Sequence, residues 1–303
     1  MMEKAFRFRI YPDEKQRRQI AKTIGCARLV YNDALDLRRQ AWEVGCIRLT
    51  YNWTSQSLTE LKKHQLFLKK VDKFALQNAL RDLDQAYKNF FAGRARYPRF
   101  RQKHSHVQSY RTSFTNGNIA VHDDTIKLPK LGRIKAAVSR LIEGRITSAT
   151  LSRHCSGRYF VSICCTDVES RQLTPVFREI EVSLGGEDMA LKRLTHSVQR
   201  SKILQKCLSR KQRGSKNRRK AKIRLDRYYE RIANQRRDFL QQYTTGIIRN
   251  YDLIIVNRLS DKGSSKDLCW NKTSKGAFVV MLEYKARWYG RRVQYIMQER
   301  IPA

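Results

Sequence analysis

The first candidate site in this sequence is the polar residue that follows a short apolar run near its end. Leu253 to Val256 are all apolar and mostly β-branched, and Asn257 comes next. Such a run predicts a buried strand of an α/β sheet. The carboxyl ends of these strands hold the chemistry in α/β folds. The amide of Asn257 can hydrogen-bond there, but it lacks the negative charge that Mg²⁺ prefers in its ligands.

The cysteines and histidines show no metal-binding spacing. The seven cysteines include no C-x-x-C pair, their number is odd, and two are adjacent. This pattern fits neither a disulfide framework nor a zinc site, so we expect buried thiols in a reducing cytoplasm. His104 and His106 lie in a basic loop, where we expect them to be solvated or to face phosphate. The cysteines are Cys26, Cys46, Cys155, Cys164, Cys165, Cys207 and Cys269.

The charge of the chain restricts its partners. Its 303 residues carry 63 Lys and Arg against 27 Asp and Glu, a formal net charge of +36. A globular chain this basic repels itself unless a polyanion shares its surface. We therefore expect nucleic acid as the partner. A membrane is the alternative, but the sequence shows no signal peptide, amphipathic anchor or long apolar run. We expect a cytoplasmic protein associated with the bacterial nucleoid.

The basic residues concentrate in one acid-free stretch. No acid occurs between Asp188 and Asp226, whereas "LSRKQRGSKNRRKAKIR" is just over half Lys and Arg. A solvated helix face is the ordinary explanation, but the acids that would form i, i+4 pairs are missing. We therefore predict phosphate contacts, with RNA or DNA left open. The predicted residues are Arg210, Lys211, Arg213, Lys216, Arg218, Arg219 and Lys220, together with Arg99, Arg101 and Lys103.

The first third of the chain predicts one strand followed by helices. "KAFRFRIYP" alternates and ends at Pro12, and Asp13 with Gln16 resembles a helix-capping pair. Apolar positions then recur at helical spacing. A second helix is expected after Thr54, and a third is expected to begin at Asp72 and to stop at Gly93. These elements predict a small helical bundle.

The rest of the chain predicts two further folds. Turn signals such as Asn116-Gly117 and Ser156-Gly157 separate short alternating runs, which predicts an antiparallel β-barrel that the N-terminal strand is a candidate to join. "VESRQLTP" resembles a linker. After it, strand–helix–strand–helix–strand indicates an α/β domain. The fold class expected is therefore α+β with several domains.

Several stretches resemble the TnpB family of transposon-encoded RNA-guided nucleases. They include "GCARLVYN", "VDKFALQNALRDLDQAYKNFF", "YPRFRQKHS", "LSRKQRGSKNR" and "LEYKARWYG", and they cover almost the whole chain in family order. The resemblance implies an oligonucleotide-binding-like wedge β-barrel over 1–11 and 95–170, with a helical recognition domain inserted over 12–94. It also implies a degenerate, truncated RNase H-like (RuvC) domain over 176–303, lacking the zinc ribbon.

The differences from the family pattern fall on its metal-binding acids. The family holds two metal ions with three acids, because close cations repel each other without carboxylates. Here Ser183 and Asn257 occupy the first two positions, and the chain stops before the third acid and the zinc ribbon. We therefore expect no metal, no cofactor and no enzymatic activity. The alternative is that Asp188 or Asp252 serves in their place.

Recognition residues of the family match positions that are present here. They imply that the chain reads a short DNA motif, while guide pairing supplies the sequence specificity. Lys73 and Gln77 lie one helical turn apart, so both can project from one face. Lys can reach guanine, Gln can bridge adenine, and a Thr methyl can touch thymine. The alternatives are a core aromatic, a solvated lysine and ordinary turn residues. The matched residues are Tyr51, Lys73, Phe74, Gln77 and Thr115.

These inferences lead to one functional hypothesis. We expect a monomeric, nuclease-dead RNA-guided DNA-binding protein that holds a guide RNA with a structured scaffold. It would bind the matching duplex and repress transcription by occupying a promoter, as the resemblance to domesticated nuclease-dead TnpB-like proteins implies. The alternatives are a decayed remnant that retains only nucleic-acid binding, and a weakly active nuclease with non-standard acids.

Overall fold

The computed structural model of the protein has two units, which we describe one at a time. It describes residues 2–169, 172–183, 192–257 and 272–296. The first unit covers residues 3–168 and the second covers residues 169–303. Within the described residues, no helix is both long enough and apolar enough to cross a lipid bilayer.

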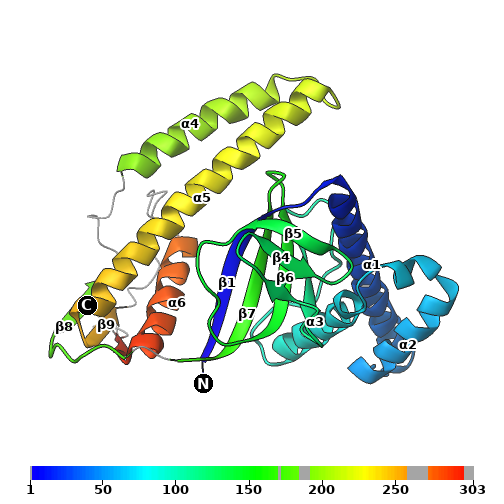
Figure 1. The fold of residues 1–303 in the computed structure, drawn as a ribbon, viewed down its shortest axis with the longest axis horizontal. Helices are drawn as coiled ribbons and strands as arrows, with labels where there is room; N and C mark the ends of the chain where they lie inside the picture. Colours follow the sequence, from blue (N-terminus) through cyan, green and yellow to red (C-terminus); the bar gives the residue numbers. More distant parts are fainter. Residues whose placement is uncertain (1, 170–171, 184–191, 258–271, 297–303) are drawn as a thin grey trace, which may run out of the picture. The chain divides into compact units, whose positions relative to one another are not determined.

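The first unit contains a seven-stranded sheet (Figure 1). The N-terminal strand lies inside this sheet, between β7 and β5, so the expected joining is confirmed. The pairings run from β2 at one edge to β3 at the other without joining those two, so closure into a barrel remains a prediction. In order β2-β6-β7-β1-β5-β4-β3, the strands are Val107–Ser113, Arg145–His154, Tyr159–Val168, Met2–Tyr11, Gly132–Ala137, Thr125–Leu128 and Ala120–Val121.

Strand β1 shows why this segment joins the sheet. Phe6, Phe8 and Ile10 are at most 3% exposed, and the residues between them face outward. Alternation of this kind buries one face of a strand and leaves the other polar. The turn predicted at Asn116-Gly117 is present, and both residues have positive φ, 48° and 67°. Such backbone angles suit Asn and Gly, which explains this dipeptide between β2 and β3.

Four helical segments lie between β1 and β2. The capping pair predicted at the start of α1 is confirmed, because the Asp13 carboxylate accepts from the Gln16 backbone N–H and the Gln16 side chain bonds back to Asp13. The second helix begins at Tyr51, four residues before the predicted start after Thr54. The segments are α1 (Glu14–Gly45), α2 (Tyr51–His64), the 3-10 helix η1 (Leu66–Lys70) and α3 (Lys73–Phe91).

Helix α3 is attached to the sheet through an amide. Asn78 is 3% exposed, and its Nδ2 donates to the Arg111 carbonyl at 2.9 Å and to Ser113 Oγ at 3.2 Å. On the same helix Leu76, Leu80 and Leu83 are fully buried, as their spacing predicted. Burial of a leucine contributes about 1.5–3 kcal/mol, so apolar contact holds the helix in place. The Asn78 hydrogen bonds then fix its register on β2.

The second unit is an α/β arrangement, as the sequence predicted. Its three strands are parallel in the order β10-β9-β8. Helices α5 and α6 pack on the sheet through a core that includes Val182, Ile254 and Phe278. The elements are β8 (Glu179–Ser183), α4 (Lys192–Ser209), α5 (Lys216–Asn250), β9 (Leu253–Asn257), α6 (Lys272–Tyr289) and β10 (Arg292–Ile296).

The cysteines differ from one another more than the sequence suggested. Cys26 and Cys165 are buried, whereas Cys46 and Cys207 are exposed, so the expectation of uniformly buried thiols was wrong. Cys46 follows the last turn of α1 as its C-cap, in the left-handed conformation with φ 52°. All six cysteines within the described ranges are free thiols. Cys269 lies outside those ranges.

A buried lysine links α5 to α6. Lys285 is 6% exposed, and its Nζ donates to the Gln241 carbonyl at 2.7 Å and to the hydroxyls of Thr244 and Thr245 at 2.8 and 2.7 Å. These three acceptors satisfy the three ammonium protons, but they bring no negative charge. Burial therefore lowers the pKa of Lys285 from 10.5 to about 8.

We expect this lysine to make stability depend on pH. Its folded-state pKa is depressed, so the unfolded chain binds more protons between about pH 8 and 10.5. The contribution of Lys285 to stability should therefore rise with pH across that window. It is smallest below pH 8. Chemical denaturation at several pH values should show a flatter profile for Lys285→Met. Lys222→Met, at an exposed position of α5, is the control. Equal pH profiles for wild type and Lys285→Met would contradict the prediction.

Candidate nucleic-acid interface

The acid-free basic stretch forms a helical hairpin. Helices α4 and α5 pack together and are joined by a short turn at 210–215 (Figure 1). Ser215 caps α5, because its hydroxyl accepts from the Arg218 backbone N–H at 3.1 Å. The Arg218 guanidinium donates to the carbonyls of Leu208 and Lys211 at 3.0 and 2.8 Å. Arg218 therefore holds the turn together from inside.

The other basic residues predicted in this stretch point into solvent. In the part of the chain that the structure describes, none of them forms an ion pair, and Asp226, the next acid along α5, is buried. Unpaired cations on a rigid hairpin suit a phosphate backbone, which carries a regular row of negative charges. These exposed residues are Arg210, Lys211, Arg213, Lys216, Arg219 and Lys220.

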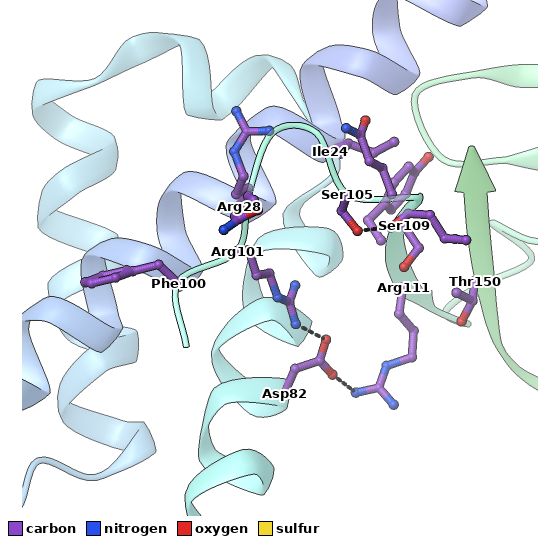
Figure 2. A pocket seen from close by; sticks show the side chains of 13 residues that line it. Ile24, Arg28, Asp82, Phe100, Arg101, Ser105, Ser109, Arg111 and Thr150 are labelled. Atoms are coloured by element: carbon purple, nitrogen blue, oxygen red, sulfur yellow. Dashed lines mark hydrogen bonds and ion pairs between the residues drawn. The ribbon is translucent and has the colours of Figure 1, made fainter. Parts of the chain in front are cut away.

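A second basic feature is a groove in the first unit. Its volume is about 680 Å³, and Arg28, Arg101 and Arg111 are among the side chains that line it. Asp82 on α3 lies between two of these arginines (Figure 2). Its carboxylate is 3.1 Å from the Arg101 guanidinium and 2.8 Å from that of Arg111. The Asp82 carboxylate thus holds two arginines apart along the groove. The side chains that line the groove still carry a net positive charge.

Arg101 has a structural role beyond the charge predicted for it. The Asn32 side chain on α1 accepts from the Arg101 backbone N–H at 2.8 Å and donates to its carbonyl at 3.1 Å. The guanidinium also lies 3.9 Å from the centre of the Tyr31 ring. Arg101 is therefore already engaged with groups of the protein itself, which leaves less of it available for a phosphate. Arg99 and Lys103, predicted with it, are exposed on either side.

Helix α3 presents the residues predicted to read a DNA motif. The Asp72 carboxylate caps this helix by accepting from the Phe74 backbone N–H at 3.1 Å. Lys73 and Gln77 follow one turn apart, so they share a face as expected. Arg81 continues that face and lies 5.8 Å from the Tyr51 ring on α2. The sequence analysis missed Arg81, although its i+4 spacing from Gln77 marks the same face.

Two further contacts complete the surroundings of this face. Thr115 is exposed just beyond β2, and the Asn118 side chain fixes its loop by accepting from the Thr115 backbone N–H at 2.8 Å. Lys62 on α2 was not predicted. Its pKa is lowered by burial and then by the nearby charge of Lys73. Two cations held close together favour an anion between them, such as a DNA phosphate.

The polar residues at the strand ends are brought together by the parallel register. Ser183 on β8 pairs with Asn257 on β9. Asn257 is 7% exposed, and its Nδ2 donates to the Glu181 carboxylate at 3.1 Å, while its Oδ1 has no partner among the residues described. The sequence analysis missed Glu181. The signal was its position two residues before Ser183, because alternate residues of a strand share a face.

We tested whether these strand ends fit a pair of metal ions. Glu181 supplies one carboxylate and Asn257 one neutral oxygen, which is too little negative charge for two close cations. In the described residues no group of three or more His, Cys, Asp or Glu side chains is placed to hold a metal. Asp188, one of the alternative acids, lies outside those residues.

Asp252, the other alternative acid, is used elsewhere. It precedes β9, at the opposite end of that strand from Asn257. Its carboxylate accepts from the Val176 and Phe177 backbone N–H groups and pairs with the Arg291 guanidinium. Burial opposes ionisation, but these donors outweigh it and lower the pKa of Asp252. The carboxylate therefore holds the 172–178 segment in place.

We expect the α4–α5 turn to bind phosphate in proportion to its exposed charge. Replacing Arg213 and Lys216 together by Ala should reduce the slope of log K against log salt by about 1.5, with no change in sequence preference. The measurement is a salt titration of RNA binding by the purified chain. Arg218→Ala is the contrast, because it removes hydrogen bonds within the turn. This variant should lower the stability of the protein and change the salt slope little. An unchanged slope in the double variant would contradict this assignment.

Comparison with family models identifies two matching regions. Residues 1–45 match the helix-turn-helix domain model of the IS605 OrfB group, and residues 189–266 match its probable transposase model. In the structure, residues 2–45 are β1 and the single long helix α1. The transposase match covers the basic hairpin and β9.

Two curated relatives span most of the chain. A Streptomyces pristinaespiralis protein is 32% identical, over 97% of this chain and 77% of its own length. An Escherichia coli K12 protein is 31% identical, over 90% and 70%. They are named "Putative RNA-guided DNA endonuclease" and "Putative RNA-guided DNA endonuclease InsQ". Among solved structures, a Cas12f1–sgRNA–target DNA complex matches 98% of this chain and 89% of its own, with a TM-score of 0.62 at 10% identity, which shows a shared fold.

These comparisons correct one expectation. The chain was expected not to be an enzyme, but both relatives are named as endonucleases and the transposase model matches the region in question. The expectation considered only the side chains of Ser183 and Asn257, and no neighbouring residue. The folded strands also bring the Glu181 carboxylate to Asn257, a contact between two strands that the expectation did not consider. At this identity and coverage, the chain belongs to the TnpB (IS605 OrfB) family, the family of these two RNA-guided DNA endonucleases.

Proposed function

We propose that the chain binds a guide RNA and the DNA duplex which that guide selects, and that it represses transcription by occupying the promoter. The observation that carries this proposal is the row of exposed cations at the α4–α5 turn, which form no ion pair within the residues that the structure describes. A rigid surface of this charge binds a phosphate backbone without regard to sequence. Sequence specificity must therefore come from another source, and a guide RNA supplies it by base pairing.

The relatives and the structural neighbour support the same partners. Both relatives are named for RNA-guided action on DNA, and the neighbour is a complex with a single guide RNA and target DNA. We assign the same two partners, a guide RNA and a target duplex, to this chain. In this proposal the chain acts as a monomer. In such systems the protein reads a short motif beside the target, and that motif starts duplex opening.

The face of α3 is our candidate reader of that motif. Gln77 can bridge adenine N6 and N7, and Lys73 can reach guanine in the major groove. Arg81 and Lys62 supply phosphate contacts beside them. Because Asn78 fastens this helix to β2, the reading residues are held by a rigid element. Tyr51, Phe74 and Thr115 complete the proposed surface.

Repression follows from occupancy. A polymerase cannot open a promoter already held as an RNA–DNA hybrid for as long as the complex lasts. This consequence holds whether or not the chain also carries the endonuclease activity of its relatives. RNA-guided cleavage is the second candidate function. The names of the relatives favour it.

The first experiment identifies the guide. The chain is expressed with its flanking genomic DNA and purified, and the bound RNA is sequenced. We expect one abundant RNA with a uniform 3′ end, in which a constant scaffold precedes a short variable segment. Heterogeneous RNA without a shared scaffold would overturn the proposal and leave a general nucleic-acid binder.

The second experiment separates occupancy from cutting. A promoter that contains the matching target is transcribed in vitro with the purified complex and Mg²⁺. The template is then freed of protein and RNA and transcribed again. Occupancy predicts that transcription returns in full. A template that remains silent and runs as two fragments would instead support cleavage as the cause of repression.

A pair of variants tests the motif-reading face. Gln77→Ala should weaken binding by roughly 5- to 150-fold on the preferred motif, with little change on mutated motifs, because one bidentate base contact is lost. Lys220→Ala on the hairpin should weaken binding equally on all motifs. Competition binding with a panel of matched duplexes distinguishes the two. Equal losses across the panel for Gln77→Ala would show that this residue does not read bases.

A further inference from the structure

The helical part of the first unit contains an aromatic pocket for which the family comparisons give no role. It lies between the end of α1, the start of α2 and the end of α3, and its volume is about 660 Å³. That volume falls within the range of about 300–1,000 Å³ typical of ligand sites. Its aromatic lining consists of Trp42, Tyr51, Tyr87, Phe90, Phe91 and Tyr97.

The rings are held in fixed positions. Tyr87 and Phe91 are stacked with centroids 6.2 Å apart, and Tyr97 meets Tyr87 edge-on at 5.6 Å. The hydroxyls of Tyr87 and Tyr97 are hydrogen-bonded at 2.9 Å. Phe90 contacts both Phe91 and Tyr97 at 5.3 Å. The cluster is therefore a preformed platform, and little side-chain entropy would be lost on binding.

The outer rings of this platform face solvent. Trp42 is 55% exposed, Phe91 is 60% exposed and Tyr97 is 42% exposed. Exposed apolar area is unfavourable in water, so a group of such rings on one surface favours a binding site.

Basic side chains line the pocket and favour a ligand with negative charge. The Arg48 guanidinium lies 4.6 Å from the Phe91 ring centre, and Lys88 stands at the rim. Arg38 is 7% exposed, and although its Nη2 pairs with Asp84 at 3.2 Å, its Nε has no hydrogen-bond partner among the described residues. An acceptor on a ligand would satisfy this buried donor.

Aromatic faces combined with arginines are the surface that unpaired nucleotides bind. Each base can stack on a ring, its phosphate can contact a cation, and the pairing is tolerant of sequence. A second protein copy would also cover apolar rings, but it would bring the same net charge of +36 to the contact. Charge complementarity therefore favours a nucleotide over a second copy of the chain.

We propose that this pocket stacks an unpaired base of the target DNA strand, close to the motif at which the duplex opens. Tyr51 connects the two sites, because it lines the pocket and also lies beside Arg81 on the motif-reading face. A strand that parts at the motif thus reaches the pocket within a few nucleotides. This inference rests on the proposed function and adds to it a binding site for the opened strand.

The test uses the full chain and a short single-stranded DNA that carries one 2-aminopurine, a base whose fluorescence falls when it stacks. Wild type should quench this signal at saturating protein. Phe91→Ala and Trp42→Ala should each lose most of the quenching and bind roughly 5- to 100-fold more weakly. Phe67→Ala is the matched control, since Phe67 is 50% exposed on the same unit and does not line the pocket. Circular dichroism melting shows that each variant is folded.

Each other outcome has a definite meaning. Equal quenching by wild type and Phe91→Ala overturns the pocket proposal alone, provided that wild type binds its guide-matched duplex. Failure of wild type on that duplex overturns the proposed function, and this inference with it. Stronger quenching with an RNA oligonucleotide of the same sequence overturns the assignment to DNA. A dimer that Phe91→Ala dissociates, seen by light scattering, would show that a second copy fills the pocket.

Discussion

The shortage of acids is the constraint on which the rest of the structure depends. With a net charge of +36, the few carboxylates near several cations limit the repulsion between them. Asp82 separates Arg101 from Arg111, and Asp84 holds Arg38 and Lys88. The exposed pairs among these contribute little individually, about 0–1 kcal/mol. Their effect here is to fix where the arginines lie.

The cations divide into two groups by partner. One group holds the fold: Arg218 closes the hairpin turn, and Arg291 joins the 172–178 segment to α5 through Thr174 and Ile248. The other group is exposed and lacks acids in the part of the chain described, as on the face of the α4–α5 hairpin. The first group has its partners within the protein, whereas the second suits the polyanion that we propose as its ligand. One composition therefore supplies both structural cations and exposed ones.

The strand ends of the second unit connect fold to chemistry. Parallel pairing places Ser183, Asn257 and Glu181 at one edge of a three-stranded sheet. A buried amide oxygen without a partner remains there, beside a carboxylate. The position agrees with where α/β folds place their chemistry. The relatives are named endonucleases, so these side chains are the first in the described ranges to be varied in a cleavage assay.

The sequence by itself determined the element order, the capped starts of α1 and α3 and the large positive charge, because periodicity, caps and net charge are local or summed properties. Tertiary structure alone decided which cations are available. Arg218 and Lys216 look alike in the sequence, yet Arg218 is used by two carbonyls across a turn. Likewise Glu181 reached Asn257 only through strand register, and the aromatic pocket arose where three helix ends meet. Contacts between distant residues depend on packing, which no single stretch of sequence encodes.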